Sequence, residues 1–259
     1  MIKILKGDIT QQQVDCIVNA TNPTLTDGNT VDAAIHQAAG SELSSYLLSS
    51  GSLEIGKAKL SPGFKLFAKQ IIHTVGPVWQ GGFHHESQLL QSCYTESLQI
   101  AKENLMESIA FPSISTGTCH YPTEEAACNA IFAVEKVVRE DEYWANKEIR
   151  FVSFDSANQI IYESLLQFPQ ISFEILVEGI VQGVYYRAKA KEMAEKLDIY
   201  GTVQNKMDGS VYIRAESDRI SIQQLIDWCR IGPSGAQVSN LKYKQVDWED
   251  FEEFNILKD

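Results

Sequence analysis

Short apolar runs alternate with longer amphipathic segments over residues 1–167. In the longer segments apolar residues recur every three or four positions, which predicts helices, whereas the short β-branched runs predict strands. The expected strands are 2–5, 14–19, 57–61, 70–75, 108–112 and 149–154. The expected helices are 31–39, 42–48, 86–104, 122–139 and 156–167. This alternation is typical of an α/β domain with a mostly parallel sheet covered on both faces.

The pattern changes after Phe168-Pro169-Gln170, where proline disfavours helix at the preceding residue. The order then becomes strand 172–178, helix 184–197, strands 202–207 and 210–216, helix 221–230 and strand 237–245. Asp208-Gly209 is a hairpin signal, because Asp-Gly supplies the positive φ that a tight turn requires. A βαββαβ order predicts an α+β, ferredoxin-like sandwich. We therefore expect two domains, at residues 1–168 and 171–259.

The charge and composition of the chain limit the classes of molecule that it is expected to bind. The 259 residues include 22 Lys and Arg against 34 Asp and Glu, a net charge of −12, and acidic groups are in excess in both parts. This balance argues against non-specific nucleic-acid binding and against an anionic membrane surface. Any phosphate-bearing ligand must be held by backbone amides, helix N-termini and a few local cations. With no close CxxC pair, no metal spacing among the five histidines, no signal peptide and no apolar run near 20 residues, we expect a cytoplasmic chain without metal or cofactor.

Three segments of the first domain carry candidate chemistry. One is the turn at residues 7–10, a second is the buried strand that leads into Asn19 and Asn22, and the third is the small-residue turn at residues 113–118. In open α/β sheets ligands lie beyond the carboxyl ends of the strands, where small-residue loops offer their amides to phosphate. A plain tight turn at residues 113–118 is the alternative.

Five motifs, in order, resemble one family. They read GDIT at residues 7–10, IVNATN at 17–22, VDAAIHQAAG at 31–40, KQIIHTVGPVW at 69–79 and AFPSISTG at 110–117. Together they resemble bacterial and mitochondrial-type macrodomains, which bind ADP-ribose and remove it from proteins or from O-acetyl-ADP-ribose. The resemblance covers nearly all of residues 1–167. It implies a three-layer α-β-α fold with a mixed sheet, and ADP-ribose or an ADP-ribosylated protein as the partner.

The resemblance also implies a site. Asp8, with the Ile9 amide beside it, would meet the adenine amine, and Phe154 would lie against the adenine. Asn19 and Asn22 end the strand in side-chain amides, and Asn22 would contact the distal ribose. Asp32 would position or activate the attacking water. The backbone amides that would wrap the diphosphate are those of Ser115, Thr116, Gly117, Thr118 and Cys119.

Each role has an alternative. Asp32 can simply favour the N-terminus of its helix, Asn22-Pro23 can be only a turn, and Phe154 can be a core residue. His36, one turn after Asp32, can be structural or functional. Cys119 can be a nucleophile or a small buried residue.

The chain departs from the family in both loops. The family has a run of glycines where residues 26–30 read Thr-Asp-Gly-Asn-Thr, with a negative charge at Asp27. In the second loop His120 replaces a glycine, and Cys119 replaces an aromatic residue near the distal ribose. Binding should survive these changes better than turnover. A catalytically weak ADP-ribose reader is therefore the alternative for this domain.

The second domain offers an anion cradle before its first helix. The loop at residues 178–187 ends in Arg187, whose planar cation suits phosphate oxygens, and Asn205 on the next strand could orient a water. Glu178-Gly179 and the strings VQGVYYR (181–187), GTVQN (201–205) and DGSV (208–211), with Ile231-Gly232-Pro233 and Phe254, resemble acylphosphatase.

This second resemblance implies metal-free hydrolysis of acyl phosphates to carboxylate and phosphate. Arg187 would bind the phosphate together with Gln182, Gly183 and Val184 of the cradle, and Asn205 would hold the water. A surface helix position for Arg187 is the alternative. The leading hypothesis is a bifunctional hydrolase. A reader tethered to an active acylphosphatase is second, and a phosphate-binding protein with both sites idle is third.

Overall fold

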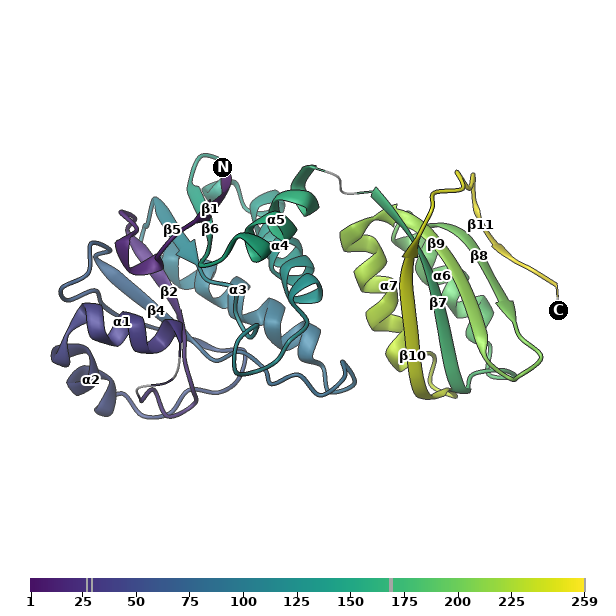
Figure 1. The fold of residues 1–259 in the computed structure, drawn as a ribbon, viewed down its shortest axis with the longest axis horizontal. Helices are drawn as coiled ribbons and strands as arrows, with labels where there is room; N and C mark the ends of the chain where they lie inside the picture. Colours follow the sequence, from purple (N-terminus) through teal and green to yellow (C-terminus); the bar gives the residue numbers. More distant parts are fainter. Residues whose placement is uncertain (27, 29, 168–169, 259) are drawn as a thin grey trace. The chain divides into compact units, whose positions relative to one another are not determined.

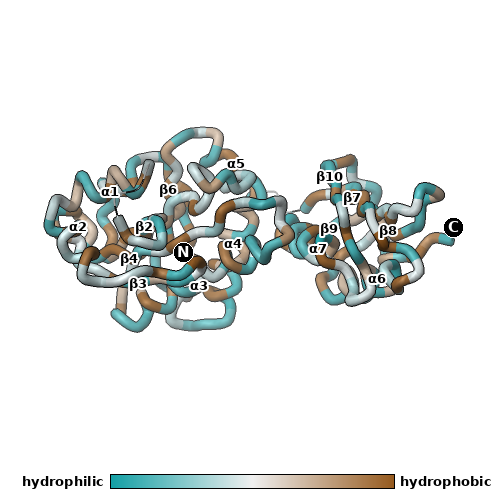
Figure 2. Tube along the Cα trace, turned by 90° about the horizontal axis from the view of Figure 1, so that it is seen from below, coloured by the Kyte–Doolittle hydropathy of each residue, from teal (hydrophilic) through white to brown (hydrophobic). Residues whose placement is uncertain are grey.

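A computed structural model describes residues 1–26, 28, 30–167 and 170–258. The chain forms two compact units, Met1–Ser164 and Leu165–Asp259, and each is described by itself (Figure 1). The sequence interpretations that involve Asp27, Phe168 and Pro169 fall outside the described residues. No helix among the described residues is long and apolar enough to span a membrane. Figure 2 shows hydrophilic and hydrophobic stretches interleaved along both units.

The first unit is built on a six-stranded mixed sheet with the order β1-β6-β5-β2-β4-β3. Its strands are β1 (Ile2–Lys6), β2 (Cys16–Ala20), β3 (Ala58–Pro62), β4 (Gln70–Thr74), β5 (Ser108–Phe111) and β6 (Glu148–Ser153). Neighbouring strands pair in parallel except β3, which pairs antiparallel with β4. The carboxyl ends of β5, β2 and β4 therefore lie side by side at one edge of the sheet.

Helices cover both faces of this sheet, as the predicted three-layer fold requires. They are α1 (Val31–Ala39), α2 (Ser41–Leu48), α3 (Glu86–Glu103), α4 (Thr123–Glu140) and α5 (Ser156–Gln167). On one face Ile17 of β2 packs in a cluster with Ile35 of α1 and Leu43 of α2. On the other, Phe151 of β6 contacts Tyr94 of α3 and Tyr162 of α5. Burial on both faces explains why these strands read as continuous apolar runs.

The second unit has a five-stranded sheet with the order β10-β7-β9-β8-β11. Its elements are β7 (Gln170–Ile180), α6 (Tyr186–Lys196), β8 (Tyr200–Asn205), β9 (Val211–Asp218), α7 (Arg219–Ile231), β10 (Gln237–Val246) and β11 (Phe254–Ile256). Ala190 of α6 and Leu225 of α7 bury against Ile175 and Ile213 of the sheet. The predicted βαββαβ order and ferredoxin-like class are confirmed.

Besides shifted strand bounds, such as those of β8 at 200–205 instead of 202–207, three local features differ from the sequence expectations. β11 was not expected; it is three residues long and gains its stability by pairing in parallel with β8. The helix expected from residue 184 begins at Tyr186, because Tyr185 adopts a left-handed backbone with φ of 62°. The strand expected to end at Phe154 ends at Ser153, and Phe154 is 85% exposed. Its interpretation as a core residue is therefore wrong.

Candidate functional site

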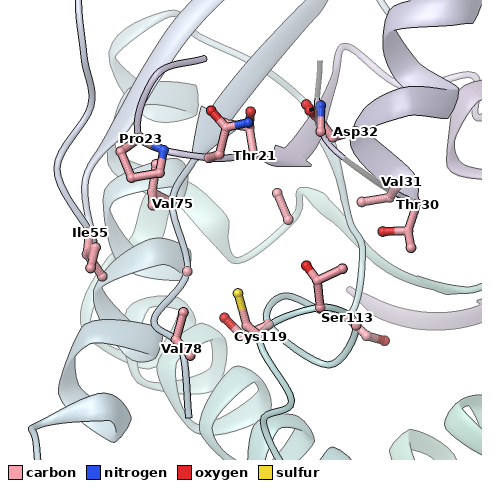
Figure 3. Close-up of a pocket in the computed structure, with 17 residues that line it drawn as sticks. Thr21, Pro23, Thr30, Val31, Asp32, Ile55, Val75, Val78, Ser113 and Cys119 are labelled. Carbon is pink, nitrogen blue, oxygen red and sulfur yellow. Dashed lines mark hydrogen bonds between the residues drawn. The ribbon is translucent and has the colours of Figure 1, made fainter. Parts of the chain in front are cut away.

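A pocket of about 260 Å³ opens at the carboxyl ends of β2, β4 and β5 (Figure 3). Residues 20–23 begin at the last residue of β2, residues 75–78 follow β4 and residues 113–119 follow β5, and all three segments contribute to its lining. The first turn of α1 adds Thr30, Val31 and Asp32. Neighbouring parallel strands end at the same edge of the sheet, so two of the three predicted segments, the end of β2 and the turn at residues 113–118, converge here. The turn at residues 7–10 does not line this pocket.

Asp32 is buried at the edge of this pocket, with 1% of its surface exposed. Its Oδ1 accepts a hydrogen bond from Asn19 Nδ2 at 2.5 Å, and its Oδ2 accepts one from the Gly28 amide at 2.5 Å. His36 Nε2 lies 3.6 Å from Oδ1, one helical turn on. A simple charge at a helix N-terminus does not account for these contacts, because both hydrogen bonds come from outside α1.

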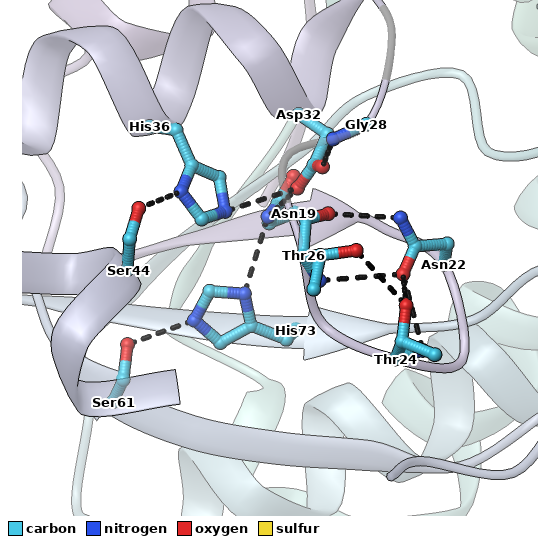
Figure 4. A network of polar contacts seen from close by, with 10 residues as sticks. All are labelled: Asn19, Asn22, Thr24, Thr26, Gly28, Asp32, His36, Ser44, Ser61 and His73. Atoms are coloured by element: carbon cyan, nitrogen blue, oxygen red, sulfur yellow. Dashed lines mark hydrogen bonds and ion pairs between the residues drawn. The ribbon is translucent and has the colours of Figure 1, made fainter. Parts of the chain in front are cut away.

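Asn19 joins Asp32 to a second histidine (Figure 4). Its Nδ2 lies 2.5 Å from Asp32 Oδ1 and 3.1 Å from His73 Nδ1, and His73 Nε2 lies 2.8 Å from Ser61 Oγ. Since the carboxylate only accepts, the Asn19 amide nitrogen must face it and donate in both directions. His73 Nδ1 is then the acceptor, and the ring proton sits on Nε2 toward Ser61.

His73 and Ser61 were not predicted from the sequence as parts of this network. The available signal was a histidine inside the apolar run Gln70–Thr74, where a buried ring must find hydrogen-bond partners on the adjacent strands. β4 lies between β2 and β3, so its neighbours supply Asn19 on one side and Ser61 on the other.

We expect the buried His73 ring to make the first unit less stable in acid. Burial, with smaller contributions from His36 and Lys59, lowers the pKa of His73 from 6.5 to about 3. Below pH 6.5 the unfolded chain therefore binds a proton that the folded chain does not, so stability is lost as the pH falls from 6.5 toward 3. This one group should lower the free energy of unfolding by about 2 kcal/mol between pH 7.5 and 5.0.

Hydrogen exchange of the peptide that covers β4, measured in the full chain at these two pH values and corrected for the intrinsic exchange rate, checks this expectation. The variant His73→Gln should be less stable at pH 7.5 but should lose much less stability on acidification than the wild type. An equal loss in both proteins would contradict the assignment of this acid sensitivity to His73.

Two hydroxyl groups lie buried in the pocket lining without hydrogen-bond partners among the described residues. They are Thr21 Oγ1 and Ser115 Oγ. Ser115 has a left-handed backbone with φ of 66°, and a Cβ at Gly76 would lie 2.1 Å from its hydroxyl oxygen. Gly76 therefore makes room for this hydroxyl. Unsatisfied buried polar atoms are rare, and a bound polar ligand would satisfy both groups.

The loop that carries Ser115 keeps backbone donors available. It is closed by hydrogen bonds from the Tyr121 amide to Ser115 O at 3.1 Å and from the His120 amide to Gly117 O at 2.9 Å. Within the part of the chain that the structure describes, the amides of Thr116, Gly117 and Thr118 donate to no protein acceptor. Such a loop can bind an anion without a cationic side chain.

Asn22 lines the pocket and also holds a turn. Its Oδ1 accepts from the Thr24 amide at 3.1 Å and the Thr26 amide at 3.3 Å, while Nδ2 donates to Thr26 O at 2.8 Å. These contacts agree with the interpretation of Asn22-Pro23 as a turn. The contact of Asn22 with a distal ribose stays a prediction.

Asp8, Ile9 and Phe154 lie at the ends of the neighbouring strands β1 and β6 rather than in the pocket lining. Asp8 Oδ1 accepts from the Thr10 amide and hydroxyl, both at 2.8 Å, and caps the short 3-10 helix Ile9–Gln11. The Ile9 side chain is buried, whereas Phe154 is exposed beside this turn. An aromatic face and a carboxylate at adjacent strand ends are compatible with the predicted adenine contacts.

The departures in the two loops have clear backbone consequences. His120 has φ of 53°, a left-handed conformation that glycine adopts more easily than other residues. Thr30 has φ of 59°, which is unfavourable for a β-branched residue. Asp27 and Asn29 lie outside the described residues. Burial raises the pKa of the Cys119 thiol, which favours the small-residue interpretation over a thiolate nucleophile.

A second pocket, of about 300 Å³, lies between the β7–α6 loop and β8. Arg187, Asn205, Gln182 and Gly183 all line it, so four predicted residues meet in one place. Gly183 and Tyr185 both have left-handed backbones, with φ of 74° and 62°. Alternation of this kind turns successive amides toward a common centre and favours an anion.

The residues of the β7–α6 loop and Arg187 make different kinds of contact. Gln182 Nε2 donates to Lys206 O at 2.9 Å and to Ser210 O at 2.8 Å, so its side chain holds the β8–β9 hairpin. The backbone amide is then the donor that Gln182 can offer to a ligand. The Val184 side chain packs against the apolar core of the unit. Arg187 Nη1 donates to Leu257 O at 3.4 Å, which links the guanidinium to the segment after β11.

Comparison with known proteins gives a match for each unit. A family model described as Macro domain matches residues 18–130, and one described as Acylphosphatase matches residues 173–256. A macro domain-containing protein of Lactiplantibacillus plantarum is 44% identical over 165 residues, which are 64% of this chain and 95% of the relative.

Two further relatives carry more specific names. An O-acetyl-ADP-ribose deacetylase of Salmonella newport is 43% identical over 169 residues, covering 64% of this chain and 93% of that protein. A solved structure of a glycine-to-valine variant of the Oceanobacillus iheyensis macrodomain with ADPR is similar, with a TM-score of 0.61 and 36% identity. That match covers 64% of this chain and 91% of the other.

Proposed function

Because the chain belongs to the macro domain family and carries an acylphosphatase domain in its second part, we propose that it is a bifunctional hydrolase. The first unit binds ADP-ribose and hydrolyses its esters to acyl groups or to protein carboxyl groups. The second hydrolyses acyl phosphates. The observation that supports the first activity is the pocket in which the buried Asp32, two unsatisfied hydroxyls and the available amides of Gly117 and Thr118 meet.

The contacts of the first pocket suggest which protein groups bind which part of the ligand. The amides of residues 116–118 and the Ser115 hydroxyl suit the diphosphate, since this acidic chain must bind anions mainly through its backbone. Asp32 is held rigidly by Asn19 and Gly28, and each carboxylate oxygen keeps a further lone pair. A water that donates to one of these oxygens would be oriented for attack.

In the proposed step water adds to the acyl carbon of the ester. The bond between that carbon and the ribose oxygen then breaks, and the ribose oxygen takes a proton. The products are a carboxylate and ADP-ribose. Rigid placement of the water next to a fixed carboxylate supplies the orientation that such a step needs.

Release of ADP-ribose from a glutamate-ADP-ribosylated protein by the full wild-type chain tests this proposal. We expect a time course in which ADP-ribose appears to completion, and calorimetric binding of free ADP-ribose to the same preparation. Binding without any release would make the first unit a reader, the second candidate function, which the strained Thr30 and the reduced glycine loop favour.

The second activity is supported by the shared pocket of Arg187, Asn205 and the Gln182–Gly183 backbone. The guanidinium and the amides would bind the phosphate oxygens, and Asn205 would hold a water in line with the phosphorus–oxygen bond. Water attacks phosphorus, the bond to the acyl oxygen breaks and a carboxylate leaves. Because a carboxylate is already a stable anion, no acid is required. Phosphate release from acetyl phosphate by the full chain tests this activity.

A further inference from the structure

One side of the first pocket is apolar. Its residues are Pro23, Ile55, Val75, Val78 and Cys119, here called the apolar wall. Figure 3 shows Pro23, Ile55, Val75 and Val78 on one side of the pocket and Asp32 across from them, with the Cys119 sulfur pointing into the space between. Four of the five side chains have no ionisable group, and burial raises the pKa of the Cys119 thiol.

The apolar wall is assembled from four chain segments that are fixed to one another by backbone hydrogen bonds. The Leu53 amide donates to Pro23 O at 2.9 Å, the Gly56 amide to Val75 O at 2.8 Å and the Trp79 amide to Cys119 O at 2.9 Å. These bonds hold the wall in place before any ligand arrives. A preformed wall loses little conformational entropy when it binds.

Apolar surface remains uncovered on this wall. Ile55 is 43% exposed and Val78 is 53% exposed, although both line a concave pocket. Exposed apolar side chains within a cavity mark a place where a ligand buries apolar surface. Neither a diphosphate nor a ribose suits it, since their oxygens would lose hydrogen bonds to water without gaining partners.

We propose that the apolar wall receives the acyl chain of the ester, and that the preferred substrates are ADP-ribose esters of linear acyl groups longer than acetyl. This inference rests on the proposed ester hydrolysis. It places the diphosphate on the amides of residues 116–118, the ester carbonyl near Asp32 and the hydrocarbon on the opposite side. Each added methylene that the wall buries improves binding about fourfold.

The test compares hydrolysis of O-acetyl-, O-butyryl- and O-hexanoyl-ADP-ribose by the full chain. We expect kcat/KM for the butyryl ester to exceed that for the acetyl ester about 15-fold, because two more methylenes are buried. Equal rates for acetyl and butyryl esters would overturn the role of the apolar wall while leaving ester hydrolysis intact. Failure to hydrolyse any of the three esters would overturn both proposals.

Two variants test whether the preference for longer acyl groups depends on the apolar wall. Cys119→Phe fills the space in front of the wall and should reduce the butyryl-to-acetyl ratio to about one or below. Val78→Thr keeps the shape but replaces a methyl group by a hydroxyl, and should lower the ratio several-fold. Cys128→Ala removes a buried thiol from α4, outside the pocket, and should leave the ratio unchanged. A wild-type ratio in both Cys119→Phe and Val78→Thr would refute the assignment.

Discussion

Replacing Arg187 by Gln is expected to lower kcat/KM for acetyl phosphate about 10³-fold, a loss at the upper end of that seen on removal of a single charge-stabilising donor. The guanidinium lines the same pocket as Asn205 and the Gln182–Gly183 backbone. Charge builds up on the phosphate oxygens during transfer, so the loss should appear in kcat as well as in KM. Initial rates of phosphate release over a range of acetyl phosphate concentrations measure both.

Two further substitutions make this result specific. Lys189→Gln removes the same charge two residues along α6, where the ammonium group bonds to Glu192 at 2.6 Å, and should leave turnover unchanged. Arg187→Lys keeps the charge but loses the planar fork, so it should recover only a small part of the activity. Undiminished turnover in Arg187→Gln would show that phosphate is bound elsewhere.

Replacing Asp32 by Ala should slow ADP-ribose release from a glutamate-ADP-ribosylated protein by about 10³-fold, within the range for loss of a positioned general base. The carboxylate is 1% exposed and fixed from two sides, so no other group of the pocket replaces it easily. Its loss leaves the Asn19 and Gly28 donors unpaired, which should also destabilise the first unit by about 1–3 kcal/mol. Release assays and thermal unfolding measure the two effects.

Calorimetric titration with ADP-ribose separates chemistry from binding in this variant. We expect Asp32→Ala to keep most of the wild-type affinity, because the diphosphate donors lie on the residue 115–118 loop. Glu42→Ala, on the exposed face of α2, is the matched control and should change neither rate nor affinity. If Asp32→Ala loses affinity as completely as rate, its carboxylate shapes the pocket and the proposed role with the water is wrong.

Local sequence patterns predicted most helices and strands because interactions between residues close in sequence determine them. The period of apolar residues located the helices of both units, and the Asp208-Gly209 turn set the β8–β9 hairpin. The sequence predictions failed where contacts with a distant part of the chain determine the local structure. β11 exists only because β8 offers an unpaired edge, and Phe154 follows a strand that ends one residue earlier than its apolar run.

The same contrast between local motifs and contacts from distant segments applies to the two sites. Asp32, Asn22, Arg187 and Asn205 could be named from motifs, and the structure brings each into a pocket. The motifs could not show that the Gln182 side chain is occupied by the β8–β9 hairpin, or that His73 supports Asp32 through Asn19. Those statements depend on strand order, since a side chain's partners lie on neighbouring strands that are distant in sequence.

The sequence alone was enough to predict the order of every α-helix and strand except β11, the family of each part and the residue types available for chemistry. These follow from periodicity and from motifs, both of which are properties of short segments. The groups that meet in space are known only from the fold: the Asp32 network, the unsatisfied Thr21 and Ser115 hydroxyls, and the apolar wall. The physical reason is that a pocket joins the ends of several strands, and the spacing between those ends is set by sheet pairing and packing rather than by any one stretch of chain.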